Sequence, residues 1–223
     1  MKVFGLALLC FAAAVQARSY GVASLSSPAQ SGENPWLVHL RLATSTGAGL
    51  LRSCVGSIIN QSWVITSARC VQDNRFIWIR YGALNVVHPE LVTEAGVAAV
   101  RAHPSADIAL IDLGRILENT DNIAPVTLAN EDTALPASGK VCGWGASESG
   151  APGEVLNCFE GSVEEQDGNI VVVSEDGQAS QFDLGGPLVS EGVQYGVLSS
   201  VSEGQAVYVN VAQYSDWISQ ITG

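Results

Sequence analysis

Residues 54–70 read CVGSIINQSWVITSARC, a β-rich run enclosed by two cysteines. Its central part, Ser57–Thr66, is rich in the β-branched residues that strands prefer. Closely spaced short strands of this kind predict an all-β barrel or sandwich. Similar short runs recur along the chain, many of them bounded by glycine, proline, asparagine or serine: Trp36–Leu42, Phe76–Tyr81, Ile170–Val173, Gln194–Leu198 and Ala206–Val211.

Three other segments have local signals of their own. The run Ala43–Arg52 (ATSTGAGLLR) is predicted to be a flexible, exposed loop. One helix is expected at about 214–222, where Ser215 followed by Asp216 offers an N-cap before an apolar stripe. Asn60 starts the one N-glycosylation acceptor, Asn-Gln-Ser; such triplets also occur by chance, so its occupancy stays open.

The bulk composition is that of a globular protein. The chain has 223 residues, of which 47% are hydrophobic and 14% charged. This length fits one large domain, or two small ones packed together, with a filled core. The formal net charge of −12 disfavours nucleic acid or an anionic membrane as a partner, because either would repel the chain.

The first residues are typical of a secretory signal peptide. Lys2 gives a short positive start, and Val3–Val15 (VFGLALLCFAAAV) is apolar but too short to span a bilayer. We therefore expect a signal peptide at 1–17 and a single mature domain at 18–223, one charge more negative than −12. The alternative is a first core helix. No later segment is long and apolar enough to be transmembrane, so we expect a secreted, extracellular protein.

Cysteine usage fits an oxidising compartment. Cys10 would leave with the signal peptide, and an even number remains, which indicates disulfides. Spacing favours the pairs Cys54–Cys70 and Cys142–Cys158, each closing a loop of about 16 residues worth roughly 3 kcal/mol. The alternative interpretation is a zinc site, but the sequence contains no Cys-x-x-Cys motif and no histidine near the cysteines at ligand spacing. We expect neither a metal nor a cofactor.

Several segments, taken in order, resemble the trypsin and chymotrypsin family of serine proteases over roughly residues 30–222. The resemblance implies two packed six-stranded antiparallel β-barrels, one at about 30–112 and one at about 113–212, with a cleft between them and a terminal helix. Each segment alone is weak evidence, but all of them occur in the family's order: NPWLVHL (34–40), CVGSIINQSWVITSARC (54–70), DIALIDL (107–113), VCGWG (141–145), FDLGGPLVS (182–190), AVYVNV (206–211) and SDWI (215–218).

The catalytic positions depart from that family. Its members use a serine nucleophile, a histidine base and an aspartate that orients the histidine. The matching residues here are Leu184, Arg69 and Asp107. Leucine has no nucleophilic atom, and arginine stays protonated near neutral pH and cannot act as a base. Only Asp107 keeps the family's residue type, so we expect no catalytic residue.

Neighbouring positions depart as well. Phe182 stands where a glycine amide usually helps to form the oxyanion hole, and Gln178 stands at the position that sets specificity. Ser180 replaces the cysteine at the rim of the specificity pocket. Ser199 and Val201 belong to Ser-Ser-Val, where the family usually has Ser-Trp-Gly.

We also expect that this chain is not activated by proteolytic cleavage. Active relatives expose an Ile-Val-x-Gly terminus whose amine pairs with the aspartate before the nucleophile. The matching stretch here is Ala23–Ser26 (ASLS), with no basic residue directly before it, so Asp183 should lack its usual partner. The short link between His103 and Asp107 predicts a cleft that is more open on that side.

The remaining carboxylate needs compensation, because an unpaired buried charge is costly. Since the resemblance brings positions 69 and 107 together, we expect an Arg69–Asp107 ion pair; the alternative is an Arg69 that points into the open cleft. Leu184 and Phe182 should form an apolar floor, which either plugs the former reaction site or binds an apolar group. The three histidines are interpreted as structural or surface residues: His39, His88 and His103.

These residues predict a catalytically inactive serine protease homologue that acts as a secreted binding or regulatory protein. Its partner would be an extracellular protein or peptide. Two alternatives stay open: a structural or storage protein of a secretion, and a residual hydrolase that uses relocated residues. A label based on family alone would be serine-type endopeptidase.

Overall fold

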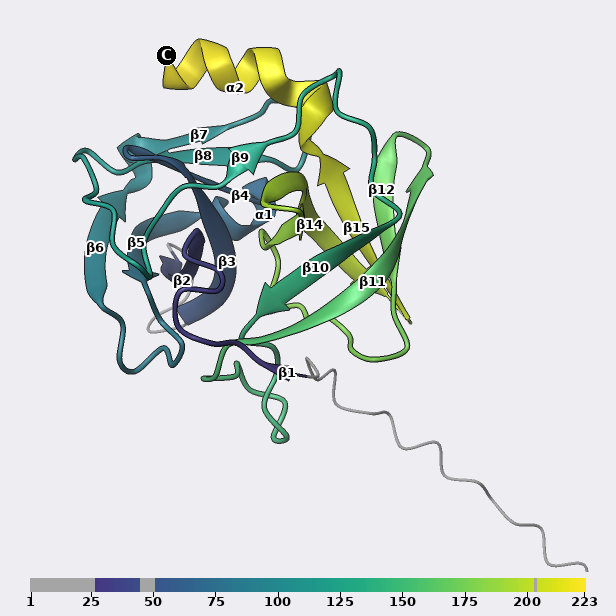
Figure 1. The fold of residues 1–223 in the computed structure, drawn as a ribbon. Coiled ribbons are helices and arrows are strands. Elements are labelled where there is room, and N and C mark those ends of the chain that lie inside the picture. The colour runs from purple at the N-terminus through teal and green to yellow at the C-terminus, as the bar shows by residue number, and fades with distance from the viewer. Residues whose placement is uncertain (1–26, 45–50, 203) are drawn as a thin grey trace, which may run out of the picture.

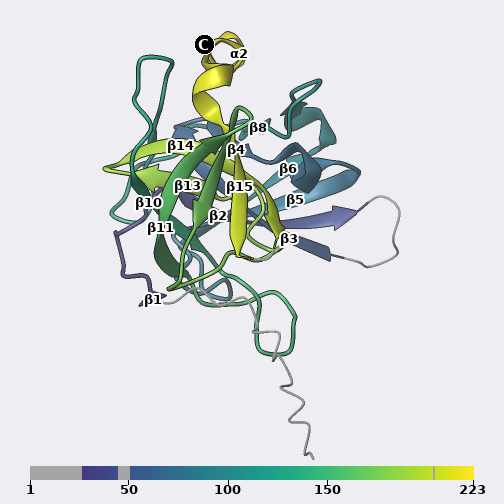
Figure 2. The same ribbon diagram turned by 90° about the vertical axis from the view of Figure 1, so that its right-hand side faces the viewer.

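The computed structural model describes residues 27–44, 51–202 and 204–223. The predicted signal peptide at 1–17 and the stretch Ala23–Ser26 lie outside the described residues. Two β-sheets lie side by side, and the C-terminal helix α2 (Ser215–Thr222) lies at one end of the molecule. The turned view of Figure 2 places α2 at the end opposite to the short strand β1 (Ser27–Pro28).

The first sheet contains seven strands in the order β6-β5-β2-β3-β4-β8-β7, with antiparallel pairing throughout. Alternation places one side of each central strand in a shared core and the other side toward the surface. A short helix, α1 (Ala68–Val71), follows β4. The strands are β2 (Leu37–Thr44), β3 (Leu51–Asn60), β4 (Trp63–Thr66), β5 (Asn74–Tyr81), β6 (Leu91–Gly96), β7 (Val100–Ala102) and β8 (Ala109–Asp112).

The second sheet closes on itself. Six of its strands pair in the order β11-β10-β13-β14-β15-β12, and the pairing of β12 with β11 closes the ring. The strand β1 pairs with β11, while β9 (Thr127–Leu128) pairs with β14 in parallel. The ring strands are β10 (Ser138–Gly143), β11 (Asn157–Gln166), β12 (Asn169–Val173), β13 (Pro187–Ser190), β14 (Val193–Ser202) and β15 (Gln205–Asn210). The expected all-β class, with two packed barrel-like sheets followed by a helix, is confirmed. The second sheet is the expected closed six-stranded barrel, whereas the first is an open, seven-stranded half-barrel.

Some sequence-based details were wrong. The run Ser57–Thr66 is a hairpin in which β3 ends and β4 begins, because the polar Gln61 and Ser62 form its turn. Both ends of the predicted loop at 43–52 are in strands, since β2 extends to Thr44 and β3 begins at Leu51. Residues 45–50 lie outside the described ranges.

The helix bounds agree with those predicted, but the predicted N-cap was wrong. Ser215 is the first residue of α2, and Tyr214 in the N-cap position makes no side-chain cap hydrogen bond. A 3-10 turn, Val211–Tyr214, runs directly into the helix, and the Ser215 amide donates to Ala212 O. The side-chain cap lies further back, at Asn210, which accepts from the Ala212 amide.

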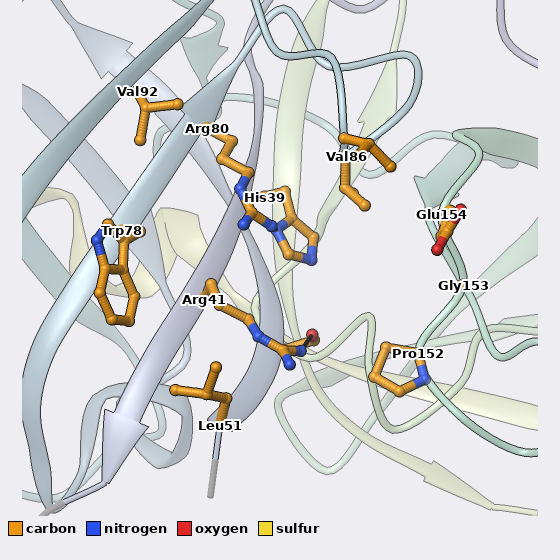
Figure 3. Close-up of a pocket in the computed structure, with 12 residues that line it drawn as sticks. His39, Arg41, Leu51, Trp78, Arg80, Val86, Val92, Pro152, Gly153 and Glu154 are labelled. Carbon is orange, nitrogen blue, oxygen red and sulfur yellow. Dashed lines mark hydrogen bonds between the residues drawn. The ribbon is translucent and has the colours of Figure 1, made fainter. Parts of the chain in front are cut away.

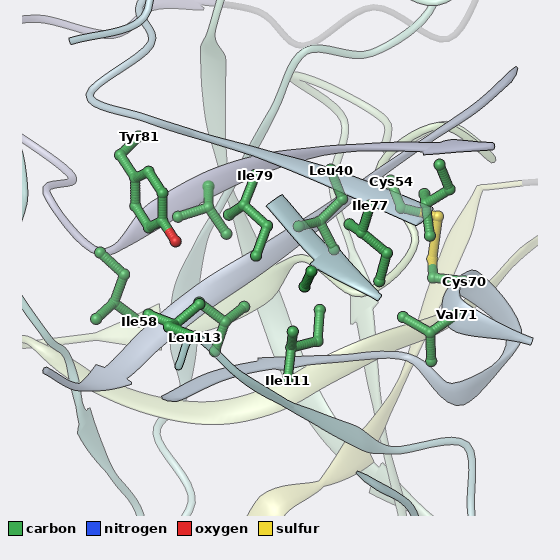
Figure 4. Close-up of a cluster of buried hydrophobic side chains, with 14 of the residues drawn as sticks. Leu40, Cys54, Ile58, Cys70, Val71, Ile77, Ile79, Tyr81, Ile111 and Leu113 are labelled. Carbon is green, nitrogen blue, oxygen red and sulfur yellow. A yellow bond between two sulfur atoms is a disulfide. The ribbon is translucent and has the colours of Figure 1, made fainter. Parts of the chain in front are cut away.

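The core has one cluster inside each sheet and two clusters shared by both. Figure 4 shows the cluster of the first sheet, with Leu40, Ile77, Ile79 and Ile111 in its interior and the disulfide of Cys54 and Cys70 at one edge. One shared cluster joins Ile65 and Leu110 to Val197 and Val209, and the other joins Val55 to Trp144. The two barrels are therefore held together by continuous apolar packing.

Both expected disulfides are present. The Cα atoms are 6.1 Å apart in Cys54–Cys70 and 4.1 Å apart in Cys142–Cys158. The first links β3 to α1, and the second joins residues directly opposite each other on β10 and β11. No helix in the described ranges is long and apolar enough to cross a membrane.

Candidate functional site

The carboxylate of Asp107 lies at the start of β8, next to α1, and is well supplied with hydrogen bonds. Its Oδ1 accepts from Ser67 Oγ at 2.9 Å and from the Arg69 amide at 2.8 Å. Its Oδ2 accepts from Ser199 Oγ at 2.7 Å. The tertiary fold thus brings Arg69 to Asp107, as the resemblance implied, and adds Ser199, which the sequence did not predict.

The Arg69 side chain makes the ion pair expected with Asp107, at the edge of the cleft. Arg69 Nε lies 3.5 Å from Asp107 Oδ2, and Arg69 Nη1 donates to the Ser199 carbonyl at 3.4 Å. The Arg69 side chain is 62% exposed, so most of the guanidinium also faces solvent. An exposed pair of this kind contributes about 0–1 kcal/mol, so the two hydroxyls and the amide are the main partners of Asp107.

Leu184 lies between the two barrels. Its side chain packs against the cluster of each sheet and is only partly exposed. Its carbonyl accepts from the Val55 amide at 2.9 Å, which docks the turn on β3. The position that holds a nucleophile in active relatives is here an apolar contact across the interface.

Asp183 is buried, and no cation of the described residues forms an ion pair with it. The ion pairs formed by the described residues, Arg69–Asp107 and Lys140–Glu33, do not include it. Its Oδ1 accepts from the Gly145 amide at 2.8 Å, and its Oδ2 accepts from the Ser180 amide and hydroxyl at 2.7 and 2.8 Å. Burial raises the pKa of Asp183, although these hydrogen bonds act in the opposite direction.

Ser180 also changes the oxyanion position. The Phe182 amide donates to Ser180 Oγ at 3.1 Å. That amide is therefore directed to a side chain of its own turn and away from the cleft. The sequence showed that Ser180 replaces a cysteine, but it did not reveal that the hydroxyl links Asp183 to Phe182.

The other specificity positions have ordinary contacts. Gln178 Nε2 donates to the Ser202 carbonyl at 3.2 Å, and Val201 packs on the core of the second barrel. Gly177 precedes Gln178 and lies against the Phe159 ring, where a Cβ would come within 2.7 Å of the Phe159 side chain.

Asn60, the possible glycosylation residue, ends β3, and its Oδ1 accepts a hydrogen bond from the Ser62 amide at 2.9 Å.

The histidines are spread apart. His39 is buried on β2, with its ring 5.2 Å from that of Trp144, and His88 is exposed. His103 lies near Asp107, but its Nδ1 accepts from the amides of Ser105 and Ala106. Within the described ranges, none of the three shares a hydrogen bond with a side-chain hydroxyl.

Two hollows adjoin Arg69. One of about 300 Å³ is lined by Arg52, Arg69, Phe182 and Leu184, among others, and corresponds to the expected apolar floor. The other, of about 410 Å³, lies beside the short link between His103 and Asp107. In the described part of the chain, no group of His, Cys, Asp and Glu side chains is arranged to hold a metal ion.

The fold and the arrangement of these positions are those of one family. The trypsin family model matches residues 25–218, so this chain belongs to the trypsin family. Among solved structures, HL collagenase superposes with a TM-score of 0.79 at 25% identity, covering 89% of this chain and 97% of its own. Neuropsin, a serine protease of mouse brain, gives 0.74 at 26% identity, covering 89% and 99%.

Curated relatives include enzymes and a homologue. Snake venom serine protease homolog rhinocerase 3 of Bitis rhinoceros is 27% identical over 223 residues, covering 85% of this chain and 83% of its own. Serine proteinase stubble of Drosophila melanogaster is 31% identical over 165 residues, covering 68% of this chain. The chain spans only 20% of stubble and 14% of the ovochymase of Halocynthia roretzi, another relative.

Proposed function

We propose that this chain is a secreted, catalytically inactive serine protease homologue that acts as a binding or regulatory protein in an extracellular fluid. The observation that carries the proposal is the pair of residues at the positions of base and nucleophile. Arg69 offers a protonated guanidinium that is already paired with Asp107, and Leu184 offers only carbon atoms packed between the barrels.

The oxyanion position supports the same conclusion. In this family, amide donors aimed at the developing negative charge contribute a large part of catalysis. The Phe182 amide instead donates to Ser180 Oγ. A peptide carbonyl entering the cleft would therefore meet neither a nucleophile nor the full set of donors.

Secretion and binding are supported by different features. Two disulfides fit an oxidising compartment, and residues 1–17 have the pattern of a signal peptide. One relative is itself named a serine protease homolog. Since the fold keeps the barrels and their cleft without the chemistry, recognition of an extracellular protein or peptide is the activity that remains.

A first experiment tests inactivity. Purified mature protein is incubated with a fluorophosphonate probe and a broad peptide substrate library, with active trypsin as the positive control. We expect neither covalent labelling nor turnover. Either signal, if it co-purifies with the protein, would refute the proposal and favour a hydrolase that uses relocated residues.

A second experiment restores the two missing side chains. The double variant Arg69→His/Leu184→Ser should still show little turnover, because the Phe182 amide stays bonded to Ser180 and Asp183 keeps its own donors. Robust turnover would show that neither the Phe182–Ser180 hydrogen bond nor the hydrogen bonds of Asp183 prevent catalysis.

Affinity purification from the native fluid separates binding from bulk storage. A binding or regulatory protein should capture a defined partner at a fixed ratio, as measured by mass spectrometry. Very high abundance without any specific partner would instead favour the structural or storage alternative.

A further inference from the structure

A third hollow, besides the two that adjoin Arg69, lies between strands β2 and β5 of the first sheet and residues 152–154. It has a volume of about 570 Å³, within the usual range for ligand sites. Figure 3 shows Arg41 on β2 and Arg80 on β5 beside His39, with Trp78 along the strand and Pro152 and Glu154 on the opposite wall.

Strand pairing brings the two arginines together. His39 is opposite Arg80 and Arg41 is opposite Trp78, so the guanidiniums project from the same face of neighbouring strands. Arg41 Nη1 donates to Ser53 Oγ at 2.8 Å, and Arg80 Nη1 lies 3.4 Å from His39 Nδ1. Burial lowers the pKa of His39 to about 3, so at neutral pH this nitrogen accepts the hydrogen bond as an uncharged imidazole.

In the part of the chain that the structure describes, neither guanidinium forms an ion pair with a carboxylate. Glu154 lies across the hollow, and Glu94 is opposite Trp78 on β6. No carboxylate of the described residues lies within 4.0 Å of Arg41 or Arg80. Burial, together with the positive charge of Arg41, also lowers the pKa of Arg80. The chain has only 10 lysines and arginines and a net charge of −12, yet two of its arginines lie close together, where their charges repel each other.

The rim of the hollow is apolar. Leu51, Val87 and Val92 line it and are 42%, 61% and 45% exposed. Exposed apolar groups around convergent charges are typical of protein-recognition sites. A sulfated sugar would leave these side chains uncovered, and a long polyanion would be repelled by the rest of the molecule.

We propose that this hollow binds an acidic segment of a partner protein, in which carboxylates flanked by apolar side chains meet Arg41 and Arg80. The proposal deepens, and rests on, the binding function proposed above. The hollow shares Leu51 and Ser53 with the smaller hollow at Arg52 and Arg69, so a longer segment can continue toward the degenerate cleft.

The test uses a fluorescein-labelled, acetylated peptide of alternating glutamate and leucine, and a matched peptide with glutamine in place of glutamate. Fluorescence polarisation at low salt should show binding of the glutamate peptide by the mature protein. The glutamine peptide and the double variant Arg41→Gln/Arg80→Gln should each bind about tenfold or more weakly. Arg75→Gln, an exposed arginine on β5 outside the hollow, removes a charge without touching the site and should change affinity less than about twofold.

A milder variant guards against misfolding. Arg41→Lys/Arg80→Lys keeps both charges and should retain most of the binding, with a circular dichroism spectrum like that of the wild type. No binding of the glutamate peptide, or binding unchanged by the Gln substitutions, would overturn the site but not the inactive-homologue proposal. Cleavage of the peptide would overturn that proposal and leave the site intact. Tighter binding of a heparin oligosaccharide through the same arginines would replace the peptide by a sulfated glycan.

Discussion

At the scale of single residues, Ser180 links two positions of the former catalytic apparatus. Its hydroxyl donates to Asp183 and accepts from the Phe182 amide, so one oxygen satisfies a buried carboxylate and occupies an oxyanion donor. Ser180 and Asp183 are both buried, whereas Phe182 is half-buried. Among the described residues, Ser180 therefore supplies two of the hydrogen bonds that satisfy this aspartate.

Substitution of Ser180 by alanine should destabilise the protein. The change leaves Asp183 with one donor fewer and the Phe182 amide without its acceptor, and unmet buried groups cost about 1–3 kcal/mol. Urea unfolding measures the loss. Ser149→Ala, which removes a hydroxyl in an exposed loop, is the control and should change the free energy of unfolding by less than about 0.5 kcal/mol. Equal effects of the two changes would contradict the role given to Ser180.

At the scale of elements, the turn before β13 is the most constrained segment. Val55 on β3 donates to the Leu184 carbonyl, and the Gly185 amide donates to Leu198 on β14, so the turn is bonded to both barrels. Gly185 has φ +83, and a Cβ there would collide with Thr66 Oγ1 and with the Val55 carbonyl. Packing alone is therefore sufficient to require the shape of this turn, with Leu184 at its centre.

Alanine at two glycines should separate backbone strain from collision. Gly192 links β13 to β14 with φ +77, and a Cβ added there would have nothing within 4 Å, so Gly192→Ala should cost only about 1 kcal/mol. Gly185→Ala adds a collision with backbone and should cost about 1–3 kcal/mol more, or prevent folding. Secretion yield and thermal midpoints report both effects. Similar losses at the two positions would mean that the turn can move away from β3.

At the scale of the whole molecule, the two barrels share their core. Two apolar clusters contain side chains from both sheets, and Leu184 contacts one further cluster on each side. His39 belongs to the same interface, because its ring on the first barrel meets Trp144 of the second. The charge state of this imidazole should therefore affect the stability of the entire fold.

Global stability should fall in acid because of His39. Burial, then the charges of Arg80 and Arg41, lowers its pKa from 6.5 to about 3. The unfolded chain binds the proton first, so the stabilisation is complete above about pH 6.5 and is lost as pH falls toward the folded pKa. The loss should approach about 1.4 kcal/mol for each pH unit in that window.

Comparison with His39→Phe isolates this effect. Asp183 acts in the opposite direction, since its raised pKa favours the folded state as pH falls, but it is common to both proteins. Urea unfolding at about pH 7 and about pH 4.5 should therefore show a steeper acid loss for the wild type than for the variant. Parallel losses would mean that His39 becomes accessible to protons without unfolding.

Local patterns were sufficient for the all-β class, the disulfide pairs and the residue types at the degenerate positions, because alternation, cysteine spacing and side-chain chemistry are all present in the linear chain. They were insufficient for the hairpin inside Ser57–Thr66 and for the N-cap of α2, where neighbouring turns supply hydrogen bonds that local preferences do not reveal. Only the tertiary structure decided that Ser180 bonds Asp183 and that Arg41 lies beside Arg80. Each of these contacts depends on strand register or on a folded turn, and such geometry is fixed by packing between segments that are distant in the chain.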